Sequence, residues 1–374
     1  MTGQVKGWCP GAYRPMMSGD GQILRVRPRL GRLTRAQMLG LCDISQTHGN
    51  GIIELTSRAN LQLRGIKEDQ HEAVLAALHT LDLLDETPDA EAKRNIVTTP
   101  IWQEGDLTTR LHAVILAALP NVPTLPAKMG IVIDTGPRPI LTDTSADFRF
   151  ECSDTGGLIL RADGVRAGKD ITEQDAPQAL IDLANWFIAT NGPAAGRMAR
   201  HLKTTPLPAT WQDSPAAPSG DRIKPGPTVG GYIYGAPFGS IEAKAMTALV
   251  HDSQATALRV TPWRTFLLED AQPCDAHGFV TDADDPLLRV HACPGAPACA
   301  SATVETRQIA RDLAARYPGT LHISGCAKGC AHPRAAATTL VGRDGTFDLV
   351  EQGHPWDQPR QRGLSAQDLL TIKA

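Results

Sequence analysis

The chain has 374 residues, of which 42% are hydrophobic and 21% charged, and its formal net charge is −3. Such a composition is ordinary for a globular protein of two or three domains, and the slight acidity disfavours nucleic acid or an anionic membrane as a partner. No apolar run is long enough to span a membrane, and the opening MTGQVKGWCPGAYRP lacks the apolar core of a signal peptide. We therefore expect a cytoplasmic protein, in whose reducing surroundings clustered cysteines indicate metal or redox chemistry instead of disulfides.

Two N-terminal segments alternate between apolar and polar residues, which predicts half-buried strands. The first, QILRVRPRL at 22–30, alternates three arginines with apolar side chains. The second, IIELTSRANLQLRGI, is expected to form one continuous strand over 52–66. Its polar face is rich in hydrogen-bond donors and carries Glu54, Thr56, Arg58, Asn60, Gln62 and Arg64.

Two helical segments complete this region. The spacing of LTRAQMLGLCDISQTHG, between the two strands, predicts a helix with Thr34 as its N-terminal cap. DQHEAVLAALHTLDLL follows the second strand with the same periodicity. The order strand, helix, strand, helix indicates one half of a ferredoxin-like fold.

Residues 240–268 read as a second copy of this region. Aligning ELTSRANLQL with RVTPWRTFLL without gaps places Trp263 opposite Arg58 and Leu267 opposite Gln62. The second copy therefore keeps the strand and lacks most of the donors. This asymmetry indicates a duplication in which one copy retains an anion-binding face.

Four cysteines form two close pairs in the C-terminal part, Cys293-x5-Cys299 and Cys326-x3-Cys330. Structural zinc favours shorter spacings on both sides. Pro- and Gly-rich loops such as CPGAPAC and SGCAKGC suit an iron–sulfur cube, because they wrap it without bulk and offer backbone N–H groups to sulfur. We therefore predict that the four thiolates hold a [4Fe–4S] cluster, with zinc as the alternative.

The remaining cysteines are scattered, and we expect buried, inert thiols at Cys9, Cys42, Cys152 and Cys274. Between the two cysteine pairs, apolar residues that recur four apart predict an amphipathic helix; they are Ile309, Leu313 and Tyr317.

The spacing C-x5-C followed by C-x3-C resembles the cluster signature of sulfite and nitrite reductases, which are duplicated enzymes that carry a sirohaem beside a [4Fe–4S] cluster. LTSRANLQLRGI resembles their strand L-T-T-R-Q-x-x-Q-x-x-x-I, which places Arg58 and Gln62 on family positions. KRNIVTTP resembles their R-N-V segment and LPAKMGI their L-P-R-K-F-K segment, which places Arg94 and Lys128.

The last of these segments departs from the reductase pattern, because Ala127 stands in place of an arginine and Gly130 in place of a lysine. Sulfite and nitrite are small anions whose reductases need a dense cationic pocket, so this loss argues against that activity. The stretch WCPGAYRPMMSGDG resembles instead the C-P-x(n)-P-M-x-S/T-G-D-G opening of precorrin-3B synthases, a sister branch in the oxygen-dependent route to cobalamin. The resemblance covers nearly the whole chain.

The resemblance implies an α+β fold: a duplicated sulfite/nitrite reductase-like architecture with two ferredoxin-like halves and two α/β core domains around a tetrapyrrole-binding saddle. The Pro-, Ser- and Gly-rich stretch between the copies is the expected linker. The expected domains are an N-terminal arm at 1–20, a first ferredoxin-like half at 21–86, a first core domain at 87–205, the linker at 206–231, a second ferredoxin-like half at 232–275, and a second core domain with the cluster at 276–374.

The resemblance also implies a substrate and a reaction. Precorrin-3A, like sirohaem, is a reduced tetrapyrrole ringed by carboxylates, which arginine binds through a planar fork that stays charged. In this family, O2-dependent monooxygenation adds an oxygen atom to the meso carbon between rings A and D. The ring A acetate then closes a γ-lactone, which prepares ring contraction. The residues expected to contact the substrate are Arg25, Arg27, Arg58, Asn60, Gln62, Arg64, Arg94 and Lys128.

The resemblance further implies a mononuclear non-haem iron that activates O2, since a cube with four thiolates has no open coordination position. No spacing selects its ligands among the available histidines, which include His48, His291, His322 and His332. Asp20 is a further candidate, but its SGDG context is typical of a plain turn.

No G-x-G-x-x-G motif follows a strand, so electrons are expected from a separate NADH-linked reductase or a ferredoxin, delivered to a monomer. Two alternatives remain. A sirohaem-dependent sulfite or nitrite reductase would bind sirohaem, with Cys330 bridging its iron to the cluster. An iron–sulfur electron carrier or zinc-stabilised binding protein would not need an arginine-lined strand. None of these readings gives a role to Arg259 and Arg264 of the second copy.

Overall fold

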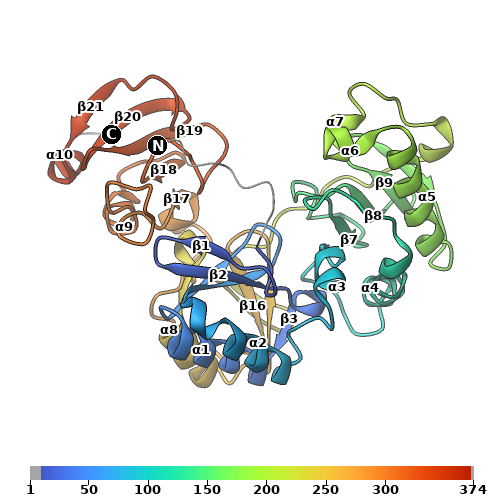
Figure 1. Cartoon of the computed structure of the whole chain (residues 1–374), viewed down its shortest axis with the longest axis horizontal. Coiled ribbons are helices and arrows are strands. Elements are labelled where there is room, and N and C mark those ends of the chain that lie inside the picture. Colours follow the sequence, from blue (N-terminus) through green and yellow to red (C-terminus); the bar gives the residue numbers. More distant parts are fainter. Residues whose placement is uncertain (1–9, 372–374) are drawn as a thin grey trace.

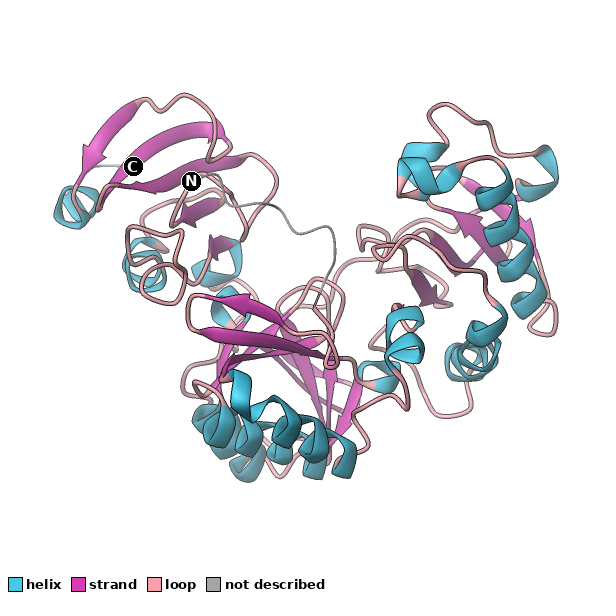
Figure 2. Cartoon of the chain, viewed as in Figure 1, coloured by secondary structure: helices cyan, strands magenta, loops and turns pink. Residues whose placement is uncertain are grey.

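The computed structural model of the chain describes residues 10–371, so the predicted inert thiol Cys9 lies outside the described residues. Figure 1 shows a central lobe flanked by two further lobes, one formed by the middle of the chain and one by its C-terminal part. Helices cover one side of the central sheets, and the two flanking lobes stand on the other side (Figure 2). No helix within the described range is long and apolar enough to cross a membrane.

The first ferredoxin-like half supplies the first strands and helices of the central lobe. Its strands are β1 (Met16–Ser18), β2 (Gly21–Val26), β3 (Arg32–Thr34), β4 (Ile52–Leu55) and β5 (Leu61–Ile66), and its helices are α1 (Arg35–His48) and α2 (His71–Thr80). The predicted cap of α1 is confirmed: the Thr34 hydroxyl accepts the N–H of Gln37, whose side chain accepts the N–H of Thr34.

The segment 52–66 forms a hairpin, so the prediction of one continuous strand is wrong. β4 and β5 pair antiparallel around a short connection. The Thr56 hydroxyl accepts two backbone N–H groups of this connection, and Ala59 adopts a left-handed backbone with φ of 51°. The step from Leu55 to Leu61 spans an even number of residues, so the alternation continues through the turn and hides it.

The second ferredoxin-like half repeats this path. It contains β12 (Gly226–Thr228), β13 (Gly231–Gly235), β14 (Ser240–Glu242), α8 (Ala243–Asp252), β15 (Ala257–Val260) and β16 (Thr265–Glu269). Arg264 occupies the position of Ala59 and is also left-handed, with φ of 62°. Phe238 and Leu30, at φ of 61° and 55°, form a second equivalent pair. Rare backbone conformations at equivalent positions show that the two copies share one design.

The two halves also exchange a strand. β14 of the second copy pairs antiparallel with β4 of the first, and β3 of the first copy pairs antiparallel with β15 of the second. The two resulting sheets have the orders β1-β2-β5-β4-β14 and β12-β13-β16-β15-β3. Buried apolar residues of both copies form one cluster, so the halves share a single core.

The second lobe is built on a mixed sheet in the order β11-β10-β9-β8-β7-β6. Its strands are β6 (Ile96–Thr98), β7 (Ile131–Asp134), β8 (Phe148–Cys152), β9 (Leu158–Ala162), β10 (Ala167–Asp170) and β11 (Ser214–Pro215). Its helices are α3 (Pro88–Lys93), α4 (Leu107–Ala118), α5 (Ala176–Ala189), α6 (Gly192–Ala195) and α7 (Met198–His201). The Pro-rich stretch 206–231 adds β11 to this sheet and β12 to a central sheet, at an edge in both cases, where proline is tolerated.

The third lobe contains both cysteine pairs and a sheet in the order β17-β18-β19-β20-β21. Its elements are β17 (Val290–Ala292), α9 (Arg307–Leu313), β18 (Leu321–Ser324), β19 (Ala336–Arg343), β20 (Thr346–Gly353), β21 (Gln361–Leu364) and α10 (Ala366–Thr371). The predicted amphipathic helix is confirmed as α9, but it is shorter than the apolar pattern. It ends at Leu313, and Tyr317 is buried just beyond it.

Candidate functional site

The polar face of the first central sheet is formed by residues in register across three strands. Arg25 of β2 lies opposite Gln62 of β5, and Gln62 lies opposite Glu54 of β4. Their neighbours Leu24 and Leu63 are fully buried in the core shared with the helices. Because side chains alternate along a strand, the polar side chains face the flanking lobes.

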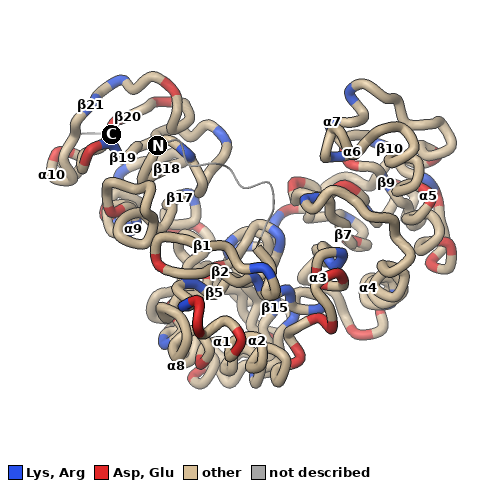
Figure 3. The backbone as a smooth tube through the Cα atoms, viewed as in Figure 1, with Lys and Arg blue, Asp and Glu red and all other residues tan. Residues whose placement is uncertain are grey.

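Three of the predicted arginines lie close to one another at one end of this face. Burial lowers the pKa of Arg27 to about 10, Glu91 opposes that effect, and the positive charges of Arg25 and Arg94 lower it further. Such an effect requires the three guanidinium groups to be near neighbours. Figure 3 shows basic residues gathered where the central sheets approach the lobe that contains α3.

Two of these arginines keep unused donors. The Nε atoms of Arg25 and Arg27 are buried and have no hydrogen-bond partner among residues 10–371. One Nη of Arg27 donates to the carbonyl oxygen of Glu91 in α3. Buried donors without partners are rare and costly, and an anionic ligand is the kind of group that could satisfy them.

Other predicted substrate contacts are engaged within the protein. Arg94 binds Asp85 through two hydrogen bonds of 2.8 Å each, and its side chain is buried. Arg64 binds Asp20 at 3.0 Å and Glu54 at 3.1 Å. Burial alone would lower the pKa of Arg64, but these two carboxylates outweigh that effect and raise it. Asp20, a candidate ligand of the implied mononuclear iron, therefore has a partner in an internal ion pair.

Arg58 and Lys128 meet where the central lobe joins the second lobe. Arg58 lies in the β4–β5 connection, and its Nη2 donates to the carbonyl oxygen of Lys128 at 2.7 Å. The Lys128 side chain is exposed. Asn60, at the end of the same connection, is 5% exposed, and its backbone N–H donates to the Thr56 hydroxyl. The contact joins the two segments that carry the family motifs.

The absence of a second lysine in the 125–130 segment has a packing explanation. Gly130 is buried, and a Cβ added there would lie 2.9 Å from Nδ2 of Asn95 and 3.1 Å from its carbonyl oxygen. The Gly130 N–H donates to Asp147 at 3.1 Å, which fixes the backbone. A lysine at this position would displace Asn95, so the segment is built for glycine. Ala127, by contrast, is exposed.

The four cysteines of the two pairs lie on loops of the third lobe. Burial raises the pKa of the Cys330 thiol, and the neighbouring thiols of Cys326, Cys293 and Cys299 raise it further. Burial likewise raises the pKa of Cys293, against backbone N–H groups that work to lower it. Cys330 and Cys293 are therefore each near enough to the other thiols of the group to be affected by them.

Backbone donors already point at this sulfur group. The N–H of Gly325 donates to Sγ of Cys293 at 3.2 Å, and Gly295 also offers its N–H to that sulfur. Within residues 10–371 no three His, Cys, Asp or Glu side chains are arranged as ligands of a single ion. A cube differs from a single ion, because each thiolate binds its own iron at a separate corner. The four thiols, with backbone N–H groups at Cys293, are compatible with such a cube.

The first cysteine loop packs against the N-terminal turn that carries the SGDG sequence. A Cβ added at Gly19 would lie 2.6 Å from the backbone nitrogen of Ala300 and 3.0 Å from the carbonyl oxygen of Ala298. Only glycine fits this close approach. The SGDG turn thus links the polar sheet face, through Asp20 and Arg64, to the cysteine lobe.

Three of the four candidate histidines come together in the third lobe. The ring centroid of His332 is 4.0 Å from that of His291 and 5.7 Å from that of His322. His48 lies elsewhere, on α1, where its ring hydrogen-bonds Gln70. The sequence contains a signal that could have found the pair on the strands, since VHAC and LHISGC both place a histidine shortly before a cysteine.

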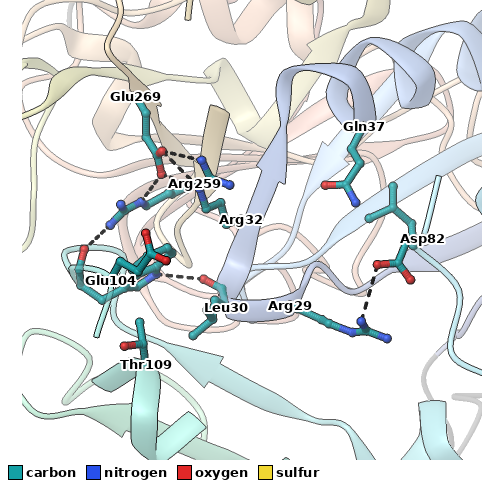
Figure 4. A pocket seen from close by; sticks show the side chains of 11 residues that line it. Arg29, Leu30, Arg32, Gln37, Asp82, Glu104, Thr109, Arg259 and Glu269 are labelled. Carbon is teal, nitrogen blue, oxygen red and sulfur yellow. Dashed lines mark hydrogen bonds and ion pairs between the residues drawn. The ribbon is translucent and has the colours of Figure 1, made fainter. Parts of the chain in front are cut away.

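A cleft elsewhere in the described part of the chain contains none of the predicted substrate residues. It has a volume of about 490 Å³ and lies where β3 meets β15 (Figure 4). Glu269 binds both Arg32 and Arg259 there, and Arg259 stacks on Trp102 at 3.8 Å from its ring centroid. The charges of Arg32 and Arg259 are therefore neutralised by Glu269 inside the cleft. Arg259 therefore has a structural role in the second copy.

Arg264, the other arginine kept in the second copy, is also structural. Its guanidinium donates to the carbonyl oxygens of Leu288 and Val290, at the start of β17. Burial lowers its pKa to about 10. The side chain ties the second ferredoxin-like half to the cysteine lobe.

Comparison with known proteins agrees with this architecture. The Nitrite/Sulfite reductase ferredoxin-like half domain family matches residues 14–81. The structure of the Mycobacterium tuberculosis NirA protein superposes with a TM-score of 0.70, at 19% identity, over 94% of this chain and 79% of that one. A Precorrin-3B synthase from Sinorhizobium sp is 30% identical over 398 aligned residues, which cover 93% of this chain and 83% of the relative.

The duplicated halves and the fold place the chain among the nitrite/sulfite reductase-like proteins. The structural likeness to NirA shows the fold alone, because the sequence identity is low. The sequence identity to the Sinorhizobium protein is more specific. The chain belongs to the precorrin-3B synthase family.

Proposed function

We propose that this protein is an oxygen-dependent oxidoreductase that converts precorrin-3A into precorrin-3B. One atom of O2 enters the macrocycle at the meso carbon between rings A and D, and the ring A acetate closes a γ-lactone. The second oxygen atom leaves as water, which consumes electrons and protons from an external donor. The observation that carries the proposal is the 30% identity to a Precorrin-3B synthase along 93% of the chain.

The polar sheet face supports this substrate. Precorrin-3A carries several carboxylates, and Arg25 and Arg27 keep buried Nε donors without partners in the described part of the chain. We assign these two arginines to substrate carboxylates, with Gln62 as a neutral contact beside them. Arg58 and Lys128 would reach a second side of the ring, from the junction of the central and second lobes.

Two of the arginines expected to contact the substrate, Arg64 and Arg94, have a structural role in this proposal. Arg64 and Arg94 each neutralise internal carboxylates, Arg64 with Asp20 and Glu54 and Arg94 with Asp85. Paired in this way, they add little net positive charge to the face, and their hydrogen bonds are in use. Arg64 and Arg94 would therefore fix the structure of the face and would not bind the substrate directly. Asn60 would act in the same way, by shaping the connection that carries Arg58.

Cys293, Cys299, Cys326 and Cys330 would hold the [4Fe–4S] cluster, which supplies single electrons when it is bound. We expect the reductant to be a separate NADH-linked reductase or a ferredoxin, and the protein to act as a monomer in the cytoplasm. A mononuclear non-haem iron would supply the open coordination position that O2 requires.

A sirohaem-dependent sulfite or nitrite reductase is the competing function, since the half-domain family that matches residues 14–81 is named for nitrite and sulfite reductases. The segment 125–130 argues against it, because Lys128 is its only basic residue and Gly130 has no room for another. A pocket that polarises a small anion needs several fixed charges.

The proposal is tested on protein purified without oxygen. Precorrin-3A is titrated against it under anaerobic conditions while the absorption spectrum of the tetrapyrrole is followed, and sulfite and nitrite reduction are assayed with a reduced viologen dye. We expect saturable binding of precorrin-3A, no sirohaem absorption and no turnover of either anion. Tightly bound sirohaem together with reduction of sulfite or nitrite would overturn the proposal.

A further inference from the structure

The short helix α3, which connects the first ferredoxin-like half to the second lobe, turns a carboxylate inwards. Glu91 is 6% exposed and is the buried residue of this helix, whereas the neighbouring alanines, Ala90 and Ala92, are exposed. Glutamate is almost never fully buried unless it is paired, because burial takes its charge out of water. The inward position of Glu91 therefore requires a specific partner.

The partner of Glu91 is the backbone of residues 11–14, which we call the N-terminal turn. Oε1 of Glu91 accepts the N–H of Ala12 at 2.6 Å, and Oε2 accepts the N–H of Tyr13 at 3.4 Å. Hydrogen bonds from backbone N–H groups to a carboxylate are charge-assisted and stronger than neutral ones. A Cβ added at Gly11 would lie 2.5 Å from Oε2 of Glu91, so the contact needs glycine at this position.

Two other segments of the first half and its connection also bind the N-terminal turn. The carbonyl oxygen of Ala12 lies 2.8 Å from Nε2 of His71 in α2. The hydroxyl of Tyr13 donates to the carbonyl oxygen of Asp85 at 2.5 Å. Each of these contacts involves one atom of the turn, whereas the carboxylate of Glu91 accepts two of its N–H groups.

Glu91 and the N-terminal turn are both attached to the arginines of the polar sheet face. The carbonyl oxygen of Gly11 accepts the N–H of Arg25 at 3.2 Å. The backbone carbonyl oxygen of Glu91 accepts a side-chain N–H of Arg27. These are the two arginines whose buried Nε atoms have no partner in the described part of the chain. Glu91 is thus linked to Arg25 through the turn and to Arg27 directly.

The carboxylate of Glu91 offsets positive charge here without occupying arginine donors. Burial lowers the pKa of Arg27 to about 10, and the charge of Glu91 opposes that effect. Within residues 10–371, however, the hydrogen bonds to this carboxylate come from backbone N–H groups and none from a guanidinium. Arg94, by contrast, gives two donors to Asp85. Because Glu91 uses its oxygens on the turn, the Nε donors of the face remain available for a ligand.

From these observations we propose that Glu91 is a positioning residue of the substrate site. Its carboxylate holds the N-terminal turn against the strand that carries Arg25 and Arg27, and it does so without taking up their Nε donors. The identity of the substrate rests on the proposed function. The anchoring of the turn rests on the contacts alone.

The anchor is tested without substrate, by hydrogen exchange and mass spectrometry on the full-length protein with its cluster in place. Peptides that include the N-terminal turn report on the N–H groups of Ala12 and Tyr13. Glu91→Ala removes their acceptor, so exchange in the turn should become roughly 10- to 100-fold faster, as for other hydrogen bonds to a charged group. Asp89→Asn is the matched control, because it removes an exposed carboxylate from the same helix. Equal exchange in the two variants would overturn the proposal.

The effect on the substrate is tested by the Kd for precorrin-3A, measured without oxygen. Glu91→Ala should raise the Kd by roughly 10-fold or more, because the turn no longer holds the two arginines in place. The control Asp89→Asn should leave the Kd unchanged. A merely structural role would lower the stability of Glu91→Ala and leave the Kd of its folded fraction unchanged, and that result would contradict the proposal.

The conservative variant separates the hydrogen bonds of Glu91 from its charge. Glu91→Gln keeps an oxygen that can accept the N–H of Ala12 and removes the charge. It should therefore recover most of the exchange protection and most of the affinity for precorrin-3A. A Glu91→Gln variant that behaves like Glu91→Ala would show that the charge matters and the anchoring does not.

Gly11→Ala tests the same contact from the other side and does not depend on the folding of any Glu91 variant. The added methyl group would displace the carboxylate of Glu91, so exchange in the turn should accelerate and the Kd should rise. In the double variant of Gly11→Ala and Glu91→Ala the two effects should not add, because both changes remove one contact. Fully additive effects would contradict the proposal.

The two measurements separate this inference from the proposed function. If the unmodified protein does not bind precorrin-3A, the proposed function is contradicted, and the exchange measurement alone decides whether Glu91 anchors the turn. If the unmodified protein and Glu91→Ala bind precorrin-3A equally well, the inference is contradicted and the proposed function stands.

Discussion

Glu54 in β4 and Arg307 at the start of α9 form an ion pair across the junction between the first ferredoxin-like half and the cysteine lobe. Glu54 also binds Arg64, and Arg64 binds Asp20 of the SGDG turn. A second nitrogen of Arg307 donates to the hydroxyl of Ser240 in β14. The network therefore connects the polar sheet face, the N-terminal turn and the helix that lies between the two cysteine pairs.

Replacing Glu54 by glutamine tests whether this network holds the lobes together. The change leaves two arginines, of which Arg64 is nearly fully buried, without their shared carboxylate. We expect the free energy of unfolding to fall by about 3 kcal/mol, as for other partly buried ion pairs that lose one member. Denaturant titration gives the value. Asp143→Asn is the control, because its pair with Arg222 is exposed and should contribute less than about 1 kcal/mol. Equal losses in the two variants would show that the network contributes no more than a surface pair.

Cluster binding is tested by cysteine variants. Cys293→Ser should abolish acid-labile sulfide and most of the bound iron, because a cube that lacks one thiolate is not retained. The control is Cys152→Ser, since this thiol is buried in β8, where its pKa is raised by burial, and it contacts only the carbonyl oxygen of Thr135 among the described hydrogen bonds. Iron and sulfide assays on the two variants decide the matter. Zinc without sulfide in the unmodified protein would contradict the iron–sulfur assignment.

Substrate binding is tested at Arg25. The variant Arg25→Gln keeps a polar side chain but shortens it and removes its charge, so it loses a charge-assisted hydrogen bond to a substrate carboxylate. Such bonds contribute about 1.5–3 kcal/mol, so the Kd for precorrin-3A should rise by roughly 10- to 100-fold. Lys67→Gln is the matched loss of one charge, at an exposed position just after β5, and should change the Kd less than about twofold. An unchanged Kd in Arg25→Gln would contradict the assignment of the substrate to this face.

The pH dependence of stability is tested at His112 in α4. Burial lowers its pKa to about 4 from the ordinary 6.5, and the charges of Arg94 and Arg29 add to the effect. As the pH falls below 6.5, the unfolded chain takes up a proton at this histidine and the folded chain does not. The stability present at higher pH is therefore lost on acidification.

The size of this effect follows from the width of the pH window. Between about pH 6.5 and pH 5 the free energy of unfolding should fall by about 2 kcal/mol more in the unmodified protein than in His112→Gln, which cannot titrate there. Asp134 acts with the opposite sign, because burial raises its pKa to about 6, but it is common to both proteins and cancels in the difference. Parallel pH curves for the two proteins would contradict the burial of a neutral His112.

The duplication and the local helix signals could be predicted from the sequence, because both depend on patterns within short segments. The cap at Thr34 needs only the residue three positions later. The repeat needs only the gap-free match of two strands. The hairpin could not be predicted for the same reason, because an alternation of even length continues through a turn unchanged. The left-handed backbone of Ala59 gives no signal either, since alanine is not a residue type that marks this conformation.

The strand exchange and the internal ion pairs could not be predicted. Hydrophobic alternation shows which face of β3 is buried but not that its partner is β15 of the other copy. Arg64 and Arg94 look the same in the sequence as Arg25, yet their partners, Asp20 and Asp85, are set by the tertiary fold. The sequence pattern shows which arginines lie on one face of the sheet. Only the tertiary fold shows which of them have no internal carboxylate partner and can bind a ligand.

The most direct test of the proposed reaction is a turnover of precorrin-3A under isotopically labelled O2, with a reductant, followed by mass spectrometry of the tetrapyrrole. The account predicts a product that gains a single labelled oxygen atom and carries the ring A lactone, in an amount that falls sharply in Arg25→Gln. Recovery of unchanged precorrin-3A from protein that carries its cluster and its second metal, or label appearing only in water, would contradict it.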